Sequence, residues 1–277
     1  MIYSDLALSQ TLERTEARAN ADFVETRARL EPSIGAAWIE VAGTYAMFDG
    51  PESPCTQTFG LGMFEEANAE QLDELEKFFA TRGAPVLHEV SPMADPSLMQ
   101  LLSSRGYTPI ELTSVMYREI ESGVPPTESR LKAGLETAKL KTRIVDESEA
   151  DLWARTSSAG WSTVMEGLGD FMLGFGQISA RCNGAYPYLA ELDGKAISTG
   201  MLFIYENACI LAGTSTIPEA RNQGAQNALL AARLKFAAER GCKLAIMGAA
   251  PGSQSQKNAQ KNGFNIAYTR TKWHLSV

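Results

Sequence analysis

The segment over residues 217–226, Ile-Pro-Glu-Ala-Arg-Asn-Gln-Gly-Ala-Gln, has the residue types of a loop that binds an anion. It follows an apolar stretch that predicts a strand over 208–216 and precedes a pattern that predicts a helix over 225–240. The first N–H groups of a helix have no partner within it, and the helix dipole adds about half a positive charge there. Gly224 allows the backbone to approach a phosphate closely, and Arg221 adds charge. The segment therefore indicates a phosphate site.

A second interpretation of the same loop stays open at this point. In it Gly224 merely permits the turn, and Arg221 is a solvated surface residue. An isolated Arg-x-x-Gly does not separate the two interpretations, so the elements around the loop have to decide between them.

The cysteines and histidines form no site that the sequence can identify. No Cys-x-x-Cys pair occurs, and no histidine lies at ligand spacing from a cysteine. We therefore expect no metal and reduced, packed thiols. A Gly-x-Gly-x-x-Gly fingerprint is also absent, which argues against a dinucleotide site. The residues concerned are Cys55, Cys182, Cys209, Cys242, His88 and His274.

Composition and charge limit the class of protein. The chain has 277 residues, enough for two domains, and 44% of them are hydrophobic. A net charge of −8 argues against a nucleic acid partner, because a phosphate backbone needs a basic face. No apolar run approaches the roughly 20 residues that span a bilayer, and the first residues lack a secretory signal. We expect a cytoplasmic protein without a membrane partner, and the sequence does not indicate its oligomeric state.

An internal repeat divides the chain into two halves. Residues 77–83, Lys-Phe-Phe-Ala-Thr-Arg-Gly, match residues 235–241, Lys-Phe-Ala-Ala-Glu-Arg-Gly, at an offset of 158. One element later, residues 105–107, Arg-Gly-Tyr, match residues 262–264, Asn-Gly-Phe, at an offset of 157. A near-constant offset across two elements indicates that the halves are copies of one fold.

Each half reads as strand, helix, strand, helix, strand, which predicts a mixed α/β sheet with parallel crossovers. Asp193-Gly194 predicts a type I′ hairpin between strands at 186–192 and 195–205, and two helices are expected within 147–182. A further helix is expected over 5–29, and the first half shows fewer strands than the second. The other predicted elements are 56–63, 68–82, 85–90 and 96–105 in the first half, and 208–216, 225–240, 243–247 and 253–262 in the second.

The turn formers Ser122-Gly123 and Pro125-Pro126 lie between the two patterned halves and predict a linker. We therefore divide the chain into a first domain over 1–124, a linker over 125–140 and a second domain over 141–277.

With these elements in place, the loop resembles motif A of the GNAT N-acetyltransferase superfamily, Gln/Arg-x-x-Gly-x-Gly/Ala. Residues 253–258, Ser-Gln-Ser-Gln-Lys-Asn, which lead to Gly263-Phe264, are similar to the second helix and the closing Gly-Phe of that superfamily. The resemblance covers about 141–277, and a weaker copy covers about 36–120. It implies two tandem GNAT-like α/β (α+β) domains, acyltransferase activity, and acetyl-CoA as co-substrate.

The resemblance also implies a set of cofactor-binding residues. The end of the predicted strand would pair with the pantetheine arm and orient the acetyl carbonyl, although ordinary β-propensity also explains its residues. The loop amides would hold the CoA pyrophosphate, and two residues of the later helix would reach the pantetheine or the thiolate, unless they simply decorate a helix start. These residues are Thr214, Ser215 and Thr216 on the strand, Arg221, Asn222, Gln223, Gly224, Ala225 and Gln226 in the loop, and Ser255 and Asn258 on the helix.

The chain departs from the family pattern at three positions. The tyrosine that many relatives use as general acid falls on Ala259, and the asparagine often found at the helix entry falls on Gly252. Gln226 stands where motif A usually ends in glycine or alanine. The general acid and base are therefore not defined by the resemblance.

Three residues remain as catalytic candidates: Ser255, Glu191 on the predicted hairpin, and Tyr268 on the last strand. Tyr188 lies beside Glu191, and each of these side chains is also compatible with a structural or surface role. Trp161 and Glu166, near the two predicted helices, are candidates for lining the acceptor cleft, although a tryptophan there is also typical of a core.

The first half lacks the anion-binding loop. The offset of 158 places residues 221–226 on Met-Phe-Glu-Glu-Ala-Asn at 63–68, without a glycine and with Glu65 and Glu66 where a pyrophosphate would lie. We interpret this half as a degenerate partner that supports the active module or shapes its acceptor cleft. If it packs beside the second module, it should cover one side of the cleft and leave a pocket. Such a pocket suits a small-molecule amine as acceptor. The alternative function is a non-catalytic acyl-CoA-binding or regulatory protein, which the missing tyrosine favours.

Overall fold

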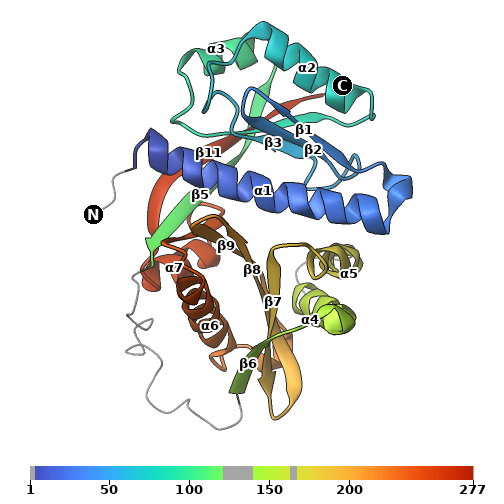
Figure 1. Cartoon of the computed structure of the whole chain (residues 1–277), viewed down its shortest axis with the longest axis vertical. Coiled ribbons are helices and arrows are strands. Elements are labelled where there is room, and N and C mark those ends of the chain that lie inside the picture. Colours follow the sequence, from blue (N-terminus) through green and yellow to red (C-terminus); the bar gives the residue numbers. More distant parts are fainter. Residues whose placement is uncertain (1–3, 121–139, 163–166, 277) are drawn as a thin grey trace. The chain divides into compact units, whose positions relative to one another are not determined.

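The computed structural model describes residues 4–120, 140–162 and 167–276 (Figure 1). Packing divides the chain into two compact units, of which the first contains Met1–Arg118 and Ile246–Val277 and the second contains Glu119–Ala245. The predicted linker 125–140 lies outside the described residues except for Leu140. The unit division differs from the domain boundaries expected from the sequence, because the last helix and strand pack with the first half.

The first unit is built on a mixed sheet in the order β1-β2-β3-β4-β11-β5. Strands β3 and β4 are parallel, as the strand–helix–strand pattern predicts, and the other pairs are antiparallel. The elements are α1 (Leu6–Leu30), β1 (Ala37–Val41), β2 (Thr44–Phe48), β3 (Gln57–Phe59), α2 (Ala69–Ala80), β4 (Val86–Val90), α3 (Ser97–Ser104), β5 (Thr108–Glu119), α7 (Gln254–Lys261) and β11 (Asn265–Leu275).

Strand β11 explains the unit division. It lies between β4 and β5, with Trp273 opposite His88 and Thr269 opposite Ser114. The Trp273 side chain also joins the core formed by α2, α3 and β4. The last strand in the sequence therefore completes the sheet that the first half begins.

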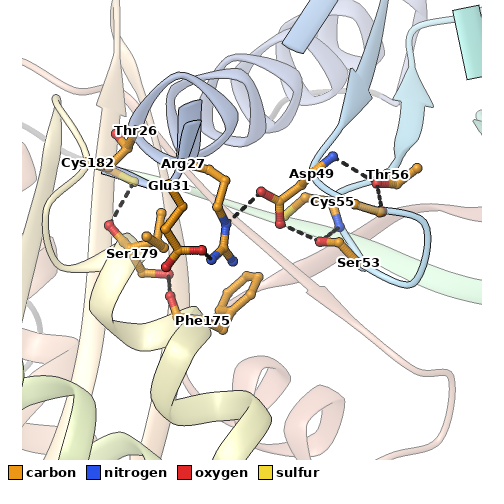
Figure 2. A network of polar contacts seen from close by, with 12 residues as sticks. Thr26, Arg27, Glu31, Asp49, Ser53, Cys55, Thr56, Phe175, Ser179 and Cys182 are labelled. Atoms are coloured by element: carbon orange, nitrogen blue, oxygen red, sulfur yellow. Dashed lines mark hydrogen bonds and ion pairs between the residues drawn. The ribbon is translucent and has the colours of Figure 1, made fainter. Parts of the chain in front are cut away.

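Helix α1 is fixed to this sheet by polar and apolar contacts. Asp5 caps its start by accepting from the backbone N–H of Leu8 at 2.8 Å. Near its end, Arg27 Nε donates to Asp49 Oδ1 at 2.9 Å, and Ser53 Oγ donates to the other carboxylate oxygen at 2.6 Å. Figure 2 shows Asp49 held between these two side chains. The contacts tie the helix to the loop between β2 and β3.

The second unit contains an antiparallel sheet in the order β6-β7-β8-β9. Asp193 and Gly194 both have positive φ, 51° and 78°, which confirms the predicted type I′ hairpin between β7 and β8. Strand β10 (Leu244–Ala249) spans the division between the units. The other elements are β6 (Leu140–Ile144), α4 (Ala150–Trp161), α5 (Leu168–Ser179), β7 (Ala185–Leu192), β8 (Lys195–Tyr205), β9 (Ala208–Thr216) and α6 (Ala225–Glu239).

Helices α4 and α6 cover opposite faces of this sheet (Figure 1). Trp153 of α4 packs with Leu189 and Met201, whereas Phe236 of α6 packs against Tyr188, the neighbour of Leu189. Adjacent strand residues point to opposite faces, so the two contacts require the two helices to lie on different sides.

One hairpin of the first half was missed, and one predicted strand is shorter than expected. The hairpin of β1 and β2 was not predicted, because its turn residues Ala42 and Gly43, at φ 49° and 77°, are not a usual Asn-Gly or Asp-Gly signal. The strand predicted over 56–63 is confined to Gln57–Phe59, since Gly60 and Gly62 take left-handed φ angles of 84° and 69°.

Candidate acyl-CoA site

The loop between β9 and α6 has the backbone geometry of an anion-binding segment. It forms a short 3-10 turn over Pro218–Ala220, and Asn222 and Gly224 then take left-handed φ angles of 64° and 82°. Gly224 is the N-cap of α6, and the first turn of the helix contains no acidic residue. A Cβ built on Gly224 meets no heavy atom within 4 Å. The helix N-terminus is therefore open for a ligand.

Arg221 has a different role from the one that charge alone suggests. Its guanidinium donates to the backbone carbonyl of Gly160 at 3.1 Å and, from Nε, to that of Thr216 at 3.4 Å. The side chain is nevertheless exposed. It ties the loop to the end of β9 and to the end of α4, and it brings a positive charge to the mouth of the loop.

The other loop side chains also brace the segment from within. Gln226 Nε2 donates to Thr216 Oγ1 at 3.2 Å, and Gln223 Nε2 lies 3.4 Å from the carbonyl of Glu219. Ala225 is buried, whereas Asn222 is exposed. The side chain of Gln226 thus turns toward β9, which removes the crowding expected from a glutamine at this motif position.

Strand β9 ends in a bulge beside the loop. Thr199 pairs with Ser215 and Met201 pairs with Ala212, so the single residue Gly200 lies opposite both Gly213 and Thr214. Gly213 has a φ of 59°, which a glycine adopts readily. Bulges of this kind change the direction of strand residues. The bulge here includes Thr214 and precedes Ser215 and Thr216, the three residues predicted to pair with the pantetheine arm.

The three hydroxyls at this strand end differ in their surroundings. Ser215 Oγ is buried and donates to the carbonyl of Ser157 at 3.0 Å. Thr216 Oγ1 is also buried and lies 2.8 Å from Ser198 Oγ. Thr214 is half-buried. Its hydroxyl donates to the carbonyl of Ala212 at 3.4 Å. All three hydroxyls are therefore bonded internally, but that of Thr214 forms the longest bond and is partly accessible.

The end of α4 packs directly against this strand end. A Cβ on Gly160 would lie 2.7 Å from Ser215 Oγ and 3.0 Å from the backbone nitrogen of Thr216. The next residue, Trp161, has a buried indole N–H without a hydrogen-bond partner among the described residues. Trp161 is half-buried at this position, and Glu166, the other candidate for lining the cleft, lies outside the described residues.

Ser255 and Asn258 lie on α7, in the first unit, whereas the loop lies in the second. Both residues are exposed, and the N-cap of α7 is Ser253, which accepts from the backbone N–H of Gln256 at 3.2 Å. Asn258 Oδ1 accepts from Gln254 Nε2 at 2.8 Å. Their proposed contacts with the cofactor stay predictions.

Glu191 and Tyr268 are both engaged by other side chains. Arg143 Nε donates to Glu191 Oε1 at 3.0 Å across β6 and β7. The Tyr268 hydroxyl is buried and donates to Glu13 Oε1 at 2.7 Å, and burial raises the pKa of Tyr268 well above its usual value. Their catalytic roles stay predictions that this geometry does not support. Tyr188 is likewise buried, and burial raises its pKa to about 12.

The corresponding helix of the first unit, α2, has a closed N-terminus. Its N-cap Asn68 accepts from the backbone N–H of Gln71 at 3.0 Å, and Gln71 Oε1 accepts in return from the N–H of Asn68 at 3.2 Å. Glu70 adds an acidic side chain in the first turn. Asn68 and Gly224 therefore take the same structural position, the N-cap of their helices. The repeat offset of 158 had instead paired Asn68 with Gln226.

No group of three or more His, Cys, Asp or Glu side chains that could hold a metal ion occurs among the described residues. Nor is any described helix long and apolar enough to cross a membrane.

Together these features define an α/β protein with an open, glycine-capped helix N-terminus beside a bulged strand end. Comparison with known proteins gives the family of one part of the chain. Residues 150–264 match the model of the acetyltransferase (GNAT) family. No curated protein sequence matches the chain.

Several solved structures share the fold over almost the whole chain. A GCN5-related N-acetyltransferase from Kribbella flavida has 15% identity and a TM-score of 0.62, with 93% of this chain and 94% of that chain covered. A tandem GNAT protein from the clavulanic acid biosynthesis pathway has 12% identity and a TM-score of 0.58, with 99% and 96% covered. A putative GNAT acetyltransferase from Novosphingobium aromaticivorans has 13% identity and a TM-score of 0.52, with 91% and 95% covered.

Residues 150–264 therefore form a domain of the acetyltransferase (GNAT) family. At these identities the structural likeness shows the fold alone, and it extends over both halves of the chain.

Proposed function

We propose that the protein transfers an acetyl group from acetyl-CoA to the amine of a small molecule. The open N-terminus of α6 carries this proposal. A helix start with a glycine N-cap, no acidic residue in its first turn, and Arg221 at its mouth suits the CoA pyrophosphate. The backbone amides that follow Gly224 would hold the pyrophosphate, and the end of β9 would hold the pantetheine arm.

The reaction is a direct transfer. The neutral amine attacks the thioester carbonyl carbon, a C–N bond forms, and the carbonyl electron pair moves onto oxygen. When this pair returns, the C–S bond breaks and the thiolate of CoA leaves. One proton passes from the amine nitrogen to the sulfur, so that the products are the acetylated amine and free CoA. The protein has to orient the thioester and stabilise the oxyanion.

The acceptor is proposed to be a compact amine rather than a folded protein or a nucleic acid. The net charge of −8 favours a cationic acceptor over a polyanion. Trp161 lies one residue beyond the contact of α4 with the proposed cofactor strand. Its buried indole N–H has no hydrogen-bond partner among the described residues, which makes it a candidate donor to a polar acceptor group.

Release of the CoA thiol from acetyl-CoA in the presence of a panel of small amines, polyamines, amino sugars and peptides tests this function. We expect release that depends on a small amine and that yields the acetylated product by mass spectrometry. Acetylation of a folded protein with none of any small amine would contradict the acceptor class.

One observation favours a second function, that of a non-catalytic acyl-CoA-binding protein. Ala259 takes the position of the family's acid tyrosine, and alanine has no hydroxyl that could protonate the leaving thiolate. The residue is also buried, at 2% exposure. Tight CoA binding together with slow hydrolysis of acetyl-CoA, unaffected by any amine, would select this second function.

A further inference from the structure

Arg233 of α6 is a buried cation without an anionic partner among the described residues. It is 1% exposed and belongs to none of the ion pairs that these residues form. The titratable groups that act on it are Cys209 and Tyr188. A hydrogen bond with Cys242, together with burial, raises the pKa of Cys209, and burial raises the pKa of Tyr188, so both groups are neutral at neutral pH. Burial lowers the pKa of Arg233 itself to about 10, which still leaves it charged. An unpaired buried charge lowers the stability of the folded protein, so its presence points to a functional role.

The guanidinium points at the bulge of β8 and β9. Its Nη1 donates to the carbonyls of Met201 at 2.9 Å and Ala212 at 3.3 Å, and its Nε donates to that of Leu229 at 3.1 Å. Gly200 makes room for the group, because a Cβ there would lie 2.8 Å from the guanidinium carbon. The side chain therefore fixes the bulge and sets a positive charge behind it.

One hydroxyl connects this charge to the proposed cofactor strand. Arg233 Nη2 donates to Thr214 Oγ1 at 3.4 Å, and this hydroxyl donates to the carbonyl of Ala212, also at 3.4 Å. A bound thioester oxygen would replace the Ala212 carbonyl as the acceptor, and long hydrogen bonds of this kind can tighten when a ligand binds. Thr214 is also the half-buried member of the three hydroxyls, whereas Ser215 and Thr216 are buried and form shorter internal hydrogen bonds, of 3.0 Å and 2.8 Å. A hydroxyl that accepts from a guanidinium is a stronger donor to a third group.

We propose that the Thr214 hydroxyl donates a hydrogen bond to the carbonyl oxygen of the acyl thioester. Arg233 is the positioning residue, and its guanidinium polarises the Thr214 hydroxyl. The inference rests on the proposed acyl transfer and names a side chain for its oxyanion. As the amine attacks, negative charge develops on the thioester oxygen. The hydrogen bond from Thr214 stabilises this charge, and the positive charge of Arg233 strengthens that hydrogen bond. When the electron pair on oxygen re-forms the C=O bond, the C–S bond breaks and the negative charge leaves on the thiolate, so neither residue is consumed.

Side-chain variants separate this role from a purely structural one. In Thr214→Val we expect kcat to fall by about 100-fold, as for the loss of one oxyanion donor, while the Kd of free CoA changes less than threefold. Thr214→Ser keeps the hydroxyl and should stay within threefold of the wild type. Arg233→Gln should lower kcat similarly, and the double variant should be no slower than the slower single variant, because the two residues act as a unit.

A spectroscopic readout follows the carbonyl itself. Difference infrared spectra of bound acetyl-CoA with a labelled carbonyl should show a shift to lower frequency in the wild type and in Thr214→Ser. The shift should be lost in Thr214→Val. Thr156→Val is the matched control, because it removes a hydroxyl that bonds only within α4, to the carbonyl of Leu152 at 2.8 Å, in the same unit.

The outcomes are distinguishable. If the wild type neither binds CoA nor releases its thiol from acetyl-CoA, the proposed function and the inference both fail. If the wild type is active and a folded Thr214→Val keeps its kcat and the carbonyl shift, the inference alone is overturned. The threonine variants keep this test valid even if Arg233→Gln does not fold.

Discussion

Asn68 and Gly224 occupy the same position, the N-cap, of the corresponding helices α2 and α6, but Asn68 alone caps its helix with a side chain. The capping box of Asn68 and Gln71 satisfies backbone N–H groups that a phosphate would otherwise bind. At Gly224 the same groups have no side-chain cap. One module thus has a helix start without a side-chain cap, of the kind that an anion can occupy, whereas local hydrogen bonds close the corresponding start in the other.

Replacement of Gly224 by aspartate should abolish CoA binding without unfolding the protein. The new Cβ meets no protein atom, so the cost is mainly that of a left-handed aspartate, about 1 kcal/mol. The carboxylate, however, would occupy the space of the pyrophosphate and repel it, which should weaken CoA binding by roughly 100-fold or more. Calorimetry measures the affinity. Gly241→Asp is the matched control, since Gly241 ends the same helix with the same φ of 82° and equally open space. Unchanged affinity in a folded Gly224→Asp would refute the phosphate-loop assignment.

We expect one CoA per chain, bound by the second unit. The first unit presents Glu70 in the first turn of α2 and a capped helix start, both unfavourable to a pyrophosphate. Calorimetric titration should give a stoichiometry of one, and Gly224→Asp should reduce it to none. A stoichiometry of two, or CoA bound beside Glu65 and Glu66, would show that the first module is not degenerate.

Replacement of Gly160 by alanine should destabilise the second unit and weaken CoA binding. The added methyl would lie 2.7 Å from Ser215 Oγ, so α4 has to move away from the strand end, at a cost of about 1–3 kcal/mol. Chemical denaturation measures the free energy of unfolding. Gly174→Ala, at a helical glycine with nothing within 4 Å, is the control and should instead stabilise by about 0.5–1 kcal/mol. Equal effects of the two substitutions would exclude the proposed close packing.

The pH dependence of stability should report on Glu13. This carboxyl is buried beside Arg270, Glu16 and Glu89, and burial raises its pKa from 4.5 to about 7. The folded protein then holds a proton that the unfolded chain releases above pH 4.5, so the contribution of Glu13 to stability is lost as pH rises from 4.5 through 7. The loss is on the order of 3 kcal/mol.

Glu13→Gln imitates the protonated acid and keeps an acceptor for Tyr268. We expect it to match the wild type near pH 5 and to be more stable near pH 8, as measured by denaturation at each pH. Destabilisation of equal size at both pH values would mean that Glu13 is ionised in the folded state.

Much of the second half was predictable because its signals are local. The bounds of β9 and the start of α6 at Ala225 agree with the predictions from hydrophobic pattern and Gly224, and Asp193-Gly194 identified its hairpin turn. The open helix start at Gly224 was predictable for the same reason, since a helix N-cap depends on residues adjacent in sequence, and its binding of an anion stays a prediction. In the first half the Ala42-Gly43 turn carries no such signal, and its hairpin was missed.

The sequence by itself determined the strand–loop–helix unit around Gly224, the repeat and the lack of a glycine in the first copy. The tertiary structure decided which side chains surround that unit. Arg233 reads in sequence as an ordinary charged residue of a helix, and its burial against Met201, Ala212 and Thr214 depends on how α6 packs on the bulge. The place of β11 between β4 and β5 was equally hidden, because strand pairing joins residues far apart in the chain and leaves no local pattern.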